Sequence, residues 1–229
     1  MDWITLPETD STNRVAKELA RQGAAHGTAV LAARQTAGRG RLGRQFFSPE
    51  GGLYLSVILR PQLEPRDLPL MTPMAAVAVC TALEQTVRVR PGIKWVNDLY
   101  LGGKKLCGIL CESTGEAVIV GIGINLRTPP EGFPPELNAV SLEGRVSAEV
   151  LAQAIRRELC SLCDALPETN FVTEYRAHSL VLGREITVHP AAGQPYPAKA
   201  VDMDSRCRLV VETAAGRTLL DSGELSIRL

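Results

Sequence analysis

The segment 35–44 carries the glycine pattern of one common nucleotide-binding fold, but the residues that follow it exclude that fold. Gly38, Gly40 and Gly43 satisfy G-x-G-x-x-G, the fingerprint of dinucleotide-binding proteins, and a strand-like run precedes them. In a Rossmann fold a helix must follow, because the pyrophosphate binds at the helix N-terminus. Here no helix-like segment follows. The chain continues instead with two phenylalanines, a Ser-Pro pair, two glycines and another strand-like run. The pattern therefore predicts a flexible loop rich in arginine rather than a Rossmann fold.

Helix-like and strand-like segments are mixed along the chain without regular βαβ alternation. Capping residues, a terminal glycine and apolar periodicity predict three helices, at 11–22, 68–85 and 148–166. Short β-branched or alternating runs predict strands at 28–33, 53–59, 99–101, 105–111 and 118–124. Gly102 and Gly103 predict a tight hairpin, because both central residues of a type I′ turn need positive φ. Together these segments predict an α+β fold with a mainly antiparallel sheet.

The C-terminal part of the chain has a different pattern. Residues 181–229 contain short alternating runs separated by turn residues, without a helical period. The runs lie at 185–188, 198–201, 208–212, 218–220 and 225–227. Closely spaced short strands are typical of a small β-barrel. We therefore expect two domains, one of residues 1–180 and a β-barrel of residues 181–229.

The charge distribution narrows the function. The chain has 25 Lys plus Arg and 25 Asp plus Glu, and this neutrality argues against a protein that coats duplex DNA or an anionic membrane. No acidic residue lies between Glu18 and Glu50. Arginines occupy positions 21, 34, 39, 41 and 44 in that stretch. Such a stretch is suited to an anionic ligand such as a nucleotide phosphate, although an ordinary solvated basic loop has the same composition.

We expect a cytoplasmic protein. No apolar run approaches the roughly 20 residues of a transmembrane helix, and the first residues lack the regions of a signal peptide. The six cysteines are therefore expected to be reduced. Cys160 and Cys163 form a C-x-x-C pair in a segment with helical periodicity, and no second pair or nearby His completes a zinc site.

Lysine is concentrated in one short span. Of the five lysines in the chain, Lys94, Lys104 and Lys105 lie there. A compact ammonium is useful where phosphate chemistry takes place, although a charged hairpin tip would look the same. Strand alternation predicts that Lys105 shares a face with Cys107 and Ile109.

Gly121 and Gly123 occupy alternate positions of a predicted strand. Such glycines mark the close approach of a ligand or another backbone, and a tight contact between sheet and helix explains them equally well. Asn125 follows and could present its amide to a ligand. Residues 10–13 by themselves predict a helix N-cap.

Taken together, these motifs resemble the biotin protein ligases, or biotin–acetyl-CoA-carboxylase ligases. The matching segments are DSTN at 10–13, QTAGRGRLGRQFFSPEGGLYLSV at 35–57, KWVNDLYL at 94–101, KKLCGILCE at 104–112, GIGIN at 121–125 and GELSIR at 223–228. Each is weak alone, and together they are specific. The resemblance implies a class II synthetase-like catalytic domain, with a mainly antiparallel sheet flanked by helices, followed by a small SH3-like β-barrel.

The resemblance also implies a reaction and its cofactors. Such ligases activate the biotin carboxylate with MgATP to give biotinyl-5′-AMP and pyrophosphate, and then transfer biotin to one lysine of a biotin carboxyl carrier protein. An anionic carboxylate must attack an anionic α-phosphate, so cationic residues must screen both groups and stabilise the transition state. The loop at 38–44 would order over the adenylate and shield it from water.

The family's pattern implies roles for individual residues. Biotin-contacting positions are matched by Ser11, Thr12, Asn13, Gln35, Gly38, Arg39, Lys105 and Gly108. Nucleotide and phosphate positions are matched by Arg41, Arg44, Lys94, Asn97 and Asn125. The expected catalytic residues are Lys105, which bridges the biotin carboxylate and the α-phosphate, Arg41, and Asp98, which matches the carboxylate proposed as base for the carrier lysine. A structural role for Asp98 beside Asn97 stays open, and no metal ligands are identified.

Two positions depart from the family's pattern. The family usually has Trp-Pro-Asn-Asp where this chain has valine at position 96, which changes the backbone stiffness and keeps the functional groups. The tryptophan common after the loop is Phe46 here, which keeps an apolar lid and loses the indole N–H.

Some family members carry an N-terminal helix-turn-helix that makes them biotin-sensing repressors. Because DSTN begins at residue 10, we expect a ligase without that domain. We therefore expect that this protein binds neither DNA nor a membrane. An exposed edge strand of the sheet could pair with a second copy in a homodimer or with the carrier protein. A lipoate-protein ligase of the same fold is the nearest alternative, and the activating substrate would decide between them. An arginine-rich nucleic-acid-binding protein is disfavoured, because only 4% of residues are aromatic.

Overall fold

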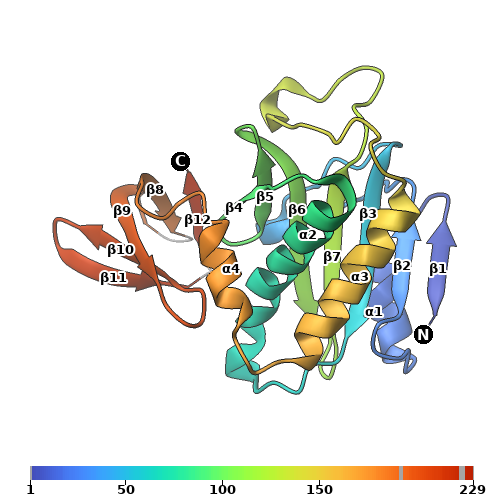
Figure 1. The fold of residues 1–229 in the computed structure, drawn as a ribbon, viewed down its shortest axis with the longest axis horizontal. Helices are drawn as coiled ribbons and strands as arrows, with labels where there is room; N and C mark the ends of the chain where they lie inside the picture. The colour runs from blue at the N-terminus through green and yellow to red at the C-terminus, as the bar shows by residue number, and fades with distance from the viewer. Residues whose placement is uncertain (1, 191–192, 222–224, 229) are drawn as a thin grey trace.

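A seven-stranded sheet forms the centre of the computed structural model, which describes residues 2–190, 193–221 and 225–228 (Figure 1). Its strands are β1 (Trp3–Leu6), β2 (Ala29–Ala32), β3 (Gly52–Leu59), β4 (Gly92–Lys94), β5 (Asp98–Leu101), β6 (Lys104–Ser113) and β7 (Val118–Asn125). Their order is β1-β2-β3-β7-β6-β5-β4. Among these described strands only β1 and β2 pair in parallel. The predicted α+β fold with a mainly antiparallel sheet is confirmed.

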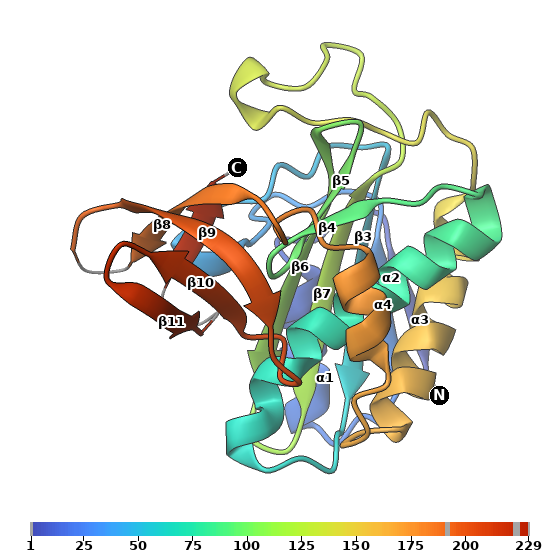
Figure 2. The same ribbon diagram turned by 60° about the vertical axis from the view of Figure 1, so that its left-hand side comes forward.

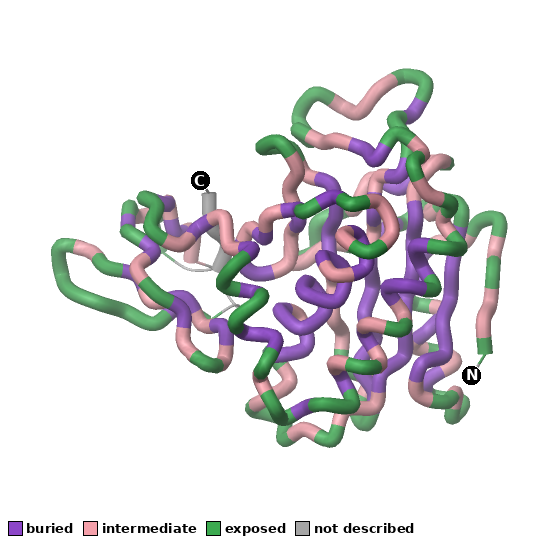
Figure 3. The backbone as a smooth tube through the Cα atoms, viewed as in Figure 1, coloured by how far each residue is buried: buried purple, intermediate pink, exposed green. Residues whose placement is uncertain are grey.

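Helices cover both faces of this sheet (Figure 1). They are α1 (Thr12–Arg21), α2 (Met71–Val87), α3 (Ala148–Asp164) and α4 (Phe171–Ala177). Helix α1 packs on one face, in an apolar cluster with Val30, Ile58 and Ile119. The other three pack against alternate strand residues, such as Leu31, on the opposite face. The central strands are buried on both faces, as Figure 3 shows, and this burial accounts for their nearly continuous apolar sequence.

Helix α2 is buried along most of its length between the sheet and helices α3 and α4. With the preceding 3₁₀ turn it forms one helical segment, Pro65–Val87, whose length and mean hydropathy of 1.3 would suit a membrane span. This corrects the expectation that no apolar stretch approaches that length. Because 67% of its most apolar window is buried inside the fold, the segment is a core helix.

A second sheet, entirely antiparallel among the described pairs, follows α4 (Figure 2). Its strands are β8 (Glu185–Pro190), β9 (Tyr196–Met203), β10 (Leu209–Thr213), β11 (Gly216–Leu220) and β12 (Leu225–Arg228), in the order β11-β10-β9-β8-β12. The predicted C-terminal strands are thus present. The boundary between residues 180 and 181 stays a prediction, and positions 223 and 224 of the GELSIR motif lie outside the described residues.

The segment 94–98 is held from behind by the C-terminal sheet region and by α4. The Trp95 indole donates a hydrogen bond to the Cys207 carbonyl at 2.9 Å, and the Tyr175 hydroxyl donates to the Val96 carbonyl at 3.0 Å. All four residues are buried. Arg206, in the same turn as Cys207, forms an ion pair across the boundary with Asp67 of the 3₁₀ turn. The segment that carries the predicted nucleotide residues is therefore held by buried contacts on its far side.

The Trp95 contact gives a prediction about stability. Replacing Trp95 with Phe is expected to lower the free energy of unfolding by about 1–3 kcal/mol, because the buried Cys207 carbonyl loses its donor. Trp3→Phe is the matched control, since the Trp3 indole donates to Thr5 at the surface, and it is expected to cost less than about 0.5 kcal/mol. Urea unfolding measures both. Equal losses would show that the contact between the sheets contributes nothing specific.

Candidate active site

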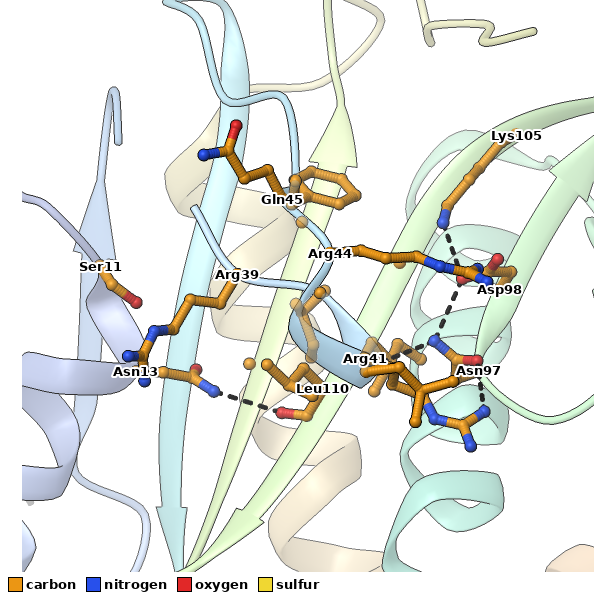
Figure 4. A pocket seen from close by; sticks show the side chains of 18 of the residues that line it. Ser11, Asn13, Arg39, Arg41, Arg44, Gln45, Asn97, Asp98, Lys105 and Leu110 are labelled. Carbon is orange, nitrogen blue, oxygen red and sulfur yellow. Dashed lines mark hydrogen bonds and ion pairs between the residues drawn. The ribbon is translucent and has the colours of Figure 1, made fainter. Parts of the chain in front are cut away.

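A cavity of about 430 Å³ lies on the α1 face of the central sheet. The start of α1, the loop at 39–46, the segment 94–98, β6 and β7 contribute to it. Its described lining contains five cationic side chains, those of Arg39, Arg41, Arg44, Lys94 and Lys105, and one carboxylate, that of Asp98. Figure 4 shows Arg39 beside Ser11 and Asn13, and Arg41 and Arg44 beside Asn97 and Asp98. We name these two regions the Ser11 end and the Asp98 end. The excess of positive charge suits a ligand with several negative charges.

The arginine-rich loop closes on itself as a short hairpin. The Phe46 N–H donates to the Gly38 carbonyl at 2.9 Å, and the Gly40 N–H donates to the Arg44 carbonyl at 2.7 Å. A Cβ on Gly38 would overlap the Phe46 carbonyl oxygen, so glycine is required there. The predicted loop, without a following helix, is present, and hydrogen bonds within its own backbone give it the shape of a hairpin. Its flexibility stays a prediction.

Glycines in the sheet make room for two side chains that approach from the α1 face. Gly108 and Gly123 are direct partners in the β6–β7 ladder, and the Phe46 ring lies against both. Gly121 leaves the same kind of space for the Asn13 amide. A Cβ at any of these positions would overlap the neighbouring side chain. The alternate glycines therefore mark a close approach by protein side chains, and Phe46 forms an apolar wall of the cavity.

Hydrogen bonds fix the start of α1 at the Ser11 end. The Thr12 N–H and hydroxyl both donate to Gln35 Oε1, at 2.9 and 3.1 Å, and Gln35 Nε2 donates to the Ser48 hydroxyl at 3.1 Å. Behind them the buried Ser56 hydroxyl donates to Asn13 Oδ1 at 2.6 Å and lies 2.8 Å from the Thr12 hydroxyl. The polar groups here are held in a fixed arrangement.

Asn97 connects the loop to the sheet at the Asp98 end. Arg41 Nη1 donates to Asn97 Oδ1 at 3.2 Å, and Asn97 Nδ2 donates to the Ile109 carbonyl at 2.9 Å and to Asp98 Oδ1 at 3.1 Å. Burial lowers the pKa of the Arg41 guanidinium below its usual value, although arginine stays protonated in proteins. A partly desolvated cation of this kind interacts strongly with an anionic ligand.

Lys105 enters the cavity because of an irregularity in β6. Asp98 pairs with Gly108 and the next β5 residue with Cys107, but the following partner is Lys105, so Leu106 is left over as a bulge. The bulge brings Lys105 to the Gly108 side, where its Nζ lies 2.8 Å from Asp98 Oδ1. This corrects the expectation from simple alternation, which placed Lys105 with Cys107, a residue buried in the core.

Most of the predicted site residues line this cavity. They are Ser11, Thr12, Asn13, Gln35, Arg39, Arg41, Arg44, Lys94, Asn97, Asp98, Lys105 and Gly108. Gly38 and Asn125 are not among them. Gly38 lies at the base of the hairpin, and Asn125 Nδ2 donates to the backbone carbonyls of Lys105 at 3.3 Å and Val140 at 3.1 Å. The Asn125 amide thus supports the strand that carries Lys105, whereas the sequence suggested that it would face a ligand.

Three residues at the site have no role in the sequence-based prediction. Ser48 and Ser56 hold Gln35 and Asn13, and Glu112 accepts a hydrogen bond from Asn13 at 2.7 Å. A signal for Ser56 existed, since it is a hydroxyl within the apolar run LYLSVIL and a buried hydroxyl needs a partner. Glu112 ends the KKLCGILCE motif, but nothing in that motif indicates its partner.

Comparisons with known proteins give a consistent result. Residues 5–128 match the Biotin/lipoate A/B protein ligase family. The chain is 34% identical to the bifunctional ligase/repressor BirA of Bacillus subtilis, over 95% of this chain and 71% of that protein. It is 32% identical to the biotin–[acetyl-CoA-carboxylase] ligase of Paracoccus denitrificans, over 96% of this chain and 98% of that protein. The structure of a biotin protein ligase from Aquifex aeolicus in complex with biotin and ATP matches with a TM-score of 0.84 at 30% identity, covering 99% of this chain and 98% of that chain.

Proposed function

Because the chain belongs to the biotin/lipoate A/B protein ligase family, we propose that it is an ATP-dependent biotin protein ligase. It activates biotin with MgATP to biotinyl-5′-AMP and pyrophosphate, and it transfers the biotin to a specific lysine of a biotin carboxyl carrier protein. The named activity of the Paracoccus denitrificans relative and the biotin and ATP bound by the Aquifex aeolicus enzyme support this proposal.

The observation that carries the proposal is the charge of the cavity. Two anions, a carboxylate and a triphosphate, must meet for the first step, and their repulsion opposes the reaction in water. Among the described residues, the cavity lining has five cationic side chains and one carboxylate, which is itself paired with Lys105. Fixed cations of this kind screen the approach and stabilise the charge that develops on the α-phosphate.

The two ends of the cavity take different parts of the adenylate. Biotin is assigned to Ser11, Thr12, Asn13, Gln35, Gly38, Arg39, Lys105 and Gly108. The nucleotide is assigned to Arg41, Arg44, Lys94, Asn97 and Asn125. The closed polar network at the Ser11 end supports the first assignment, and the cluster of cations around Asn97 supports the second. Gly38 and Asn125 would act through the backbone and strand they support.

The Lys105 ammonium lies beside the Asp98 carboxylate, at 2.8 Å from Oδ1. In the first step a biotin carboxylate oxygen attacks the α-phosphorus and pyrophosphate leaves. The ammonium of Lys105 stabilises the carboxylate oxygen and an α-phosphate oxygen, and Arg41 stabilises the phosphate. In the second step the carrier amine attacks the acyl carbon and AMP leaves. Asp98 then accepts the amine proton. It is the one carboxylate among the described residues that line the cavity.

Magnesium enters as part of the MgATP substrate. In the described part of the chain no group of three or more His, Cys, Asp or Glu side chains is arranged to hold a metal. Mg²⁺ is commonly held by one or two carboxylates together with substrate phosphates and water. Asp98, the one carboxylate among the described lining residues, fits an ion that arrives with the triphosphate and is not held by a full set of protein ligands.

The proposal extends to the setting of the reaction. The partner is a biotin carboxyl carrier domain. The protein is cytoplasmic and binds neither DNA nor a membrane. It acts as a homodimer in which the edge strand β1 pairs with a second copy. The position of β1 at one edge of the sheet supports the pairing, and the neutral net charge supports the absence of DNA and membrane binding.

The test is pyrophosphate exchange with the purified full chain. We expect exchange of labelled pyrophosphate into ATP that depends on biotin, and labelling of a carrier domain at one lysine. Exchange that depends on lipoate instead would assign the chain to the other branch of the family. Tight nucleic-acid binding that weakens with salt, without adenylate formation, would refute a ligase.

A further inference from the structure

The Glu112 carboxylate contacts three side chains from two separate segments of the chain. Its Oε2 accepts a hydrogen bond from Asn13 Nδ2 at 2.7 Å, and its Oε1 pairs with Lys17 Nζ and lies 3.9 Å from Arg39 Nη1. Asn13 and Lys17 are four residues apart on one face of α1, and Arg39 comes from the arginine-rich loop. One carboxylate on β6 therefore contacts both segments that form the Ser11 end of the cavity.

The carboxylate is held in its charged form. The Glu112 side chain is only 21% exposed, beside a second cavity on the other side of the loop. Burial alone would raise the pKa of Glu112, but hydrogen bonds from Lys17 and Asn13 outweigh burial and keep the pKa below its usual value. Glu112 is thus an anion with two hydrogen-bond donors, Asn13 and Lys17, and one longer ion pair, with Arg39.

Through Asn13 the carboxylate acts on the start of α1. The Asn13 amide lies against Gly121, its Oδ1 accepts from Ser56 at 2.6 Å, and its Nδ2 also approaches the Leu110 carbonyl at 3.4 Å. Its oxygen and its nitrogen both have partners in the protein, so its orientation is set by the sheet. Ser11 and Thr12 precede it directly and line the cavity.

Through Arg39 the same carboxylate acts on the loop. The Arg39 side chain is 56% exposed, and Glu112 is the acid with which it forms an ion pair among the described residues. Figure 4 shows the Arg39 guanidinium beside Asn13, and the Asn13 amide itself donates to Glu112. Without a counter-charge there, an exposed arginine on a loop would sample many rotamers.

We propose that Glu112 is a positioning residue for biotin: it sets the orientation of Asn13 at the start of α1 and holds the Arg39 guanidinium at the Ser11 end. This rests on the proposed function, because biotin is the ligand assigned to that end. A purely structural role would be different. In that case Glu112 would tie α1 to β6 through Lys17, and the biotin site would not depend on it in particular.

The experiment compares Glu112→Gln with Lys17→Met in biotin-dependent pyrophosphate exchange, with KM measured for biotin and for ATP. Glu112→Gln keeps the shape and places an N–H among donors, so it is expected to raise the biotin KM about 10- to 100-fold and to change the ATP KM less than about twofold. Lys17→Met removes the tie between helix and strand, while Asn13 and Arg39 still pair with the Glu112 carboxylate. Its biotin KM is expected to stay within about threefold of the wild type.

Each other outcome overturns the proposal. A biotin KM within threefold of the wild type in Glu112→Gln, an equal rise in both variants, or an equal rise in the KM for ATP would each assign Glu112 a structural role only. If Glu112→Gln does not fold, Glu112→Asp, which is one methylene shorter, supplies the same comparison. Wild-type protein without biotin-dependent exchange would refute the proposed function itself, and the wild-type assay separates that failure from the failure of Glu112.

Discussion

Lys105→Met is expected to reduce biotin-dependent pyrophosphate exchange about 100- to 1,000-fold while the fold stays intact. The Lys105 ammonium lies 2.8 Å from Asp98 Oδ1 and 5.8 Å from the Phe46 ring centroid. Its removal leaves the Asp98 carboxylate uncompensated where a carboxylate and a phosphate must meet, so one stabilising charge becomes a net repulsion. Methionine keeps an unbranched apolar side chain at this position, and this limits the structural effect.

The matched control is Lys104→Met. Lys104 is the neighbouring residue on β6, carries the same charge and is exposed outside the cavity. Its exchange rate is expected to stay within about twofold of the wild type, and circular dichroism checks the fold of both variants. Near wild-type exchange by Lys105→Met would show that its role was misassigned, and equal losses in both variants would point to a general effect of charge.

Local patterns predicted much of the fold because local interactions form those elements. The hairpin at Gly102 and Gly103 has φ values of 58° and 78°, as its turn type requires. Helix α3 begins at the predicted position, where the Ser147 side chain accepts a hydrogen bond from the Val150 N–H. Helix α2 begins at Met71, later than predicted, because the turn that contains Pro69 is 3₁₀.

The missed elements depend on partners that are distant in the sequence. Strand β1 has only four residues and is defined by its parallel pairing with β2, and β4 has three residues paired with β5. Helix α4 has seven residues and no side-chain cap. Such short segments carry too little periodicity to be recognised alone.

The residues of the candidate site also fall into those that the sequence predicts and those that only tertiary packing places. Its cationic residues could be predicted, because arginines without acidic neighbours and clustered lysines are visible as composition. The bulge at Leu106, which turns Lys105 into the cavity, depends on the register with β5. The contact of Asn13 with Glu112 spans 99 residues, and the fit of Phe46 against Gly108 and Gly123 needs three segments in place. The sequence can indicate which residues carry charge, while tertiary packing decides which way the charges face.

Arg41→Gly is expected to release biotinyl-5′-AMP into solution about 10- to 100-fold faster than the wild type, in the absence of a carrier. Arg41 Nη1 donates to Asn97 Oδ1 at 3.2 Å, so it fastens the loop to the sheet at the Asp98 end and places a partly buried cation there. Substitution removes a charge-assisted contact with the phosphate. Glycine also frees the backbone beside Gly40, so the loop closes less readily over the mixed anhydride.

The measurement is the partition of labelled adenylate between protein and filtrate after a single turnover with biotin and MgATP. Arg34→Gly is the matched control, since it makes the same change in the same acid-free stretch, and Arg34 pairs at the surface with Glu8 at 3.1 Å. The control is expected to retain the adenylate as the wild type does. If Arg41→Gly retains it equally well, closure does not depend on the Arg41 contact with Asn97. If both variants release it, the loop responds to net charge and not to that contact. Because Arg41 is the loop arginine that donates to Asn97 among the described hydrogen bonds, release confined to Arg41→Gly would locate the closing contact at the nucleotide end of the cavity.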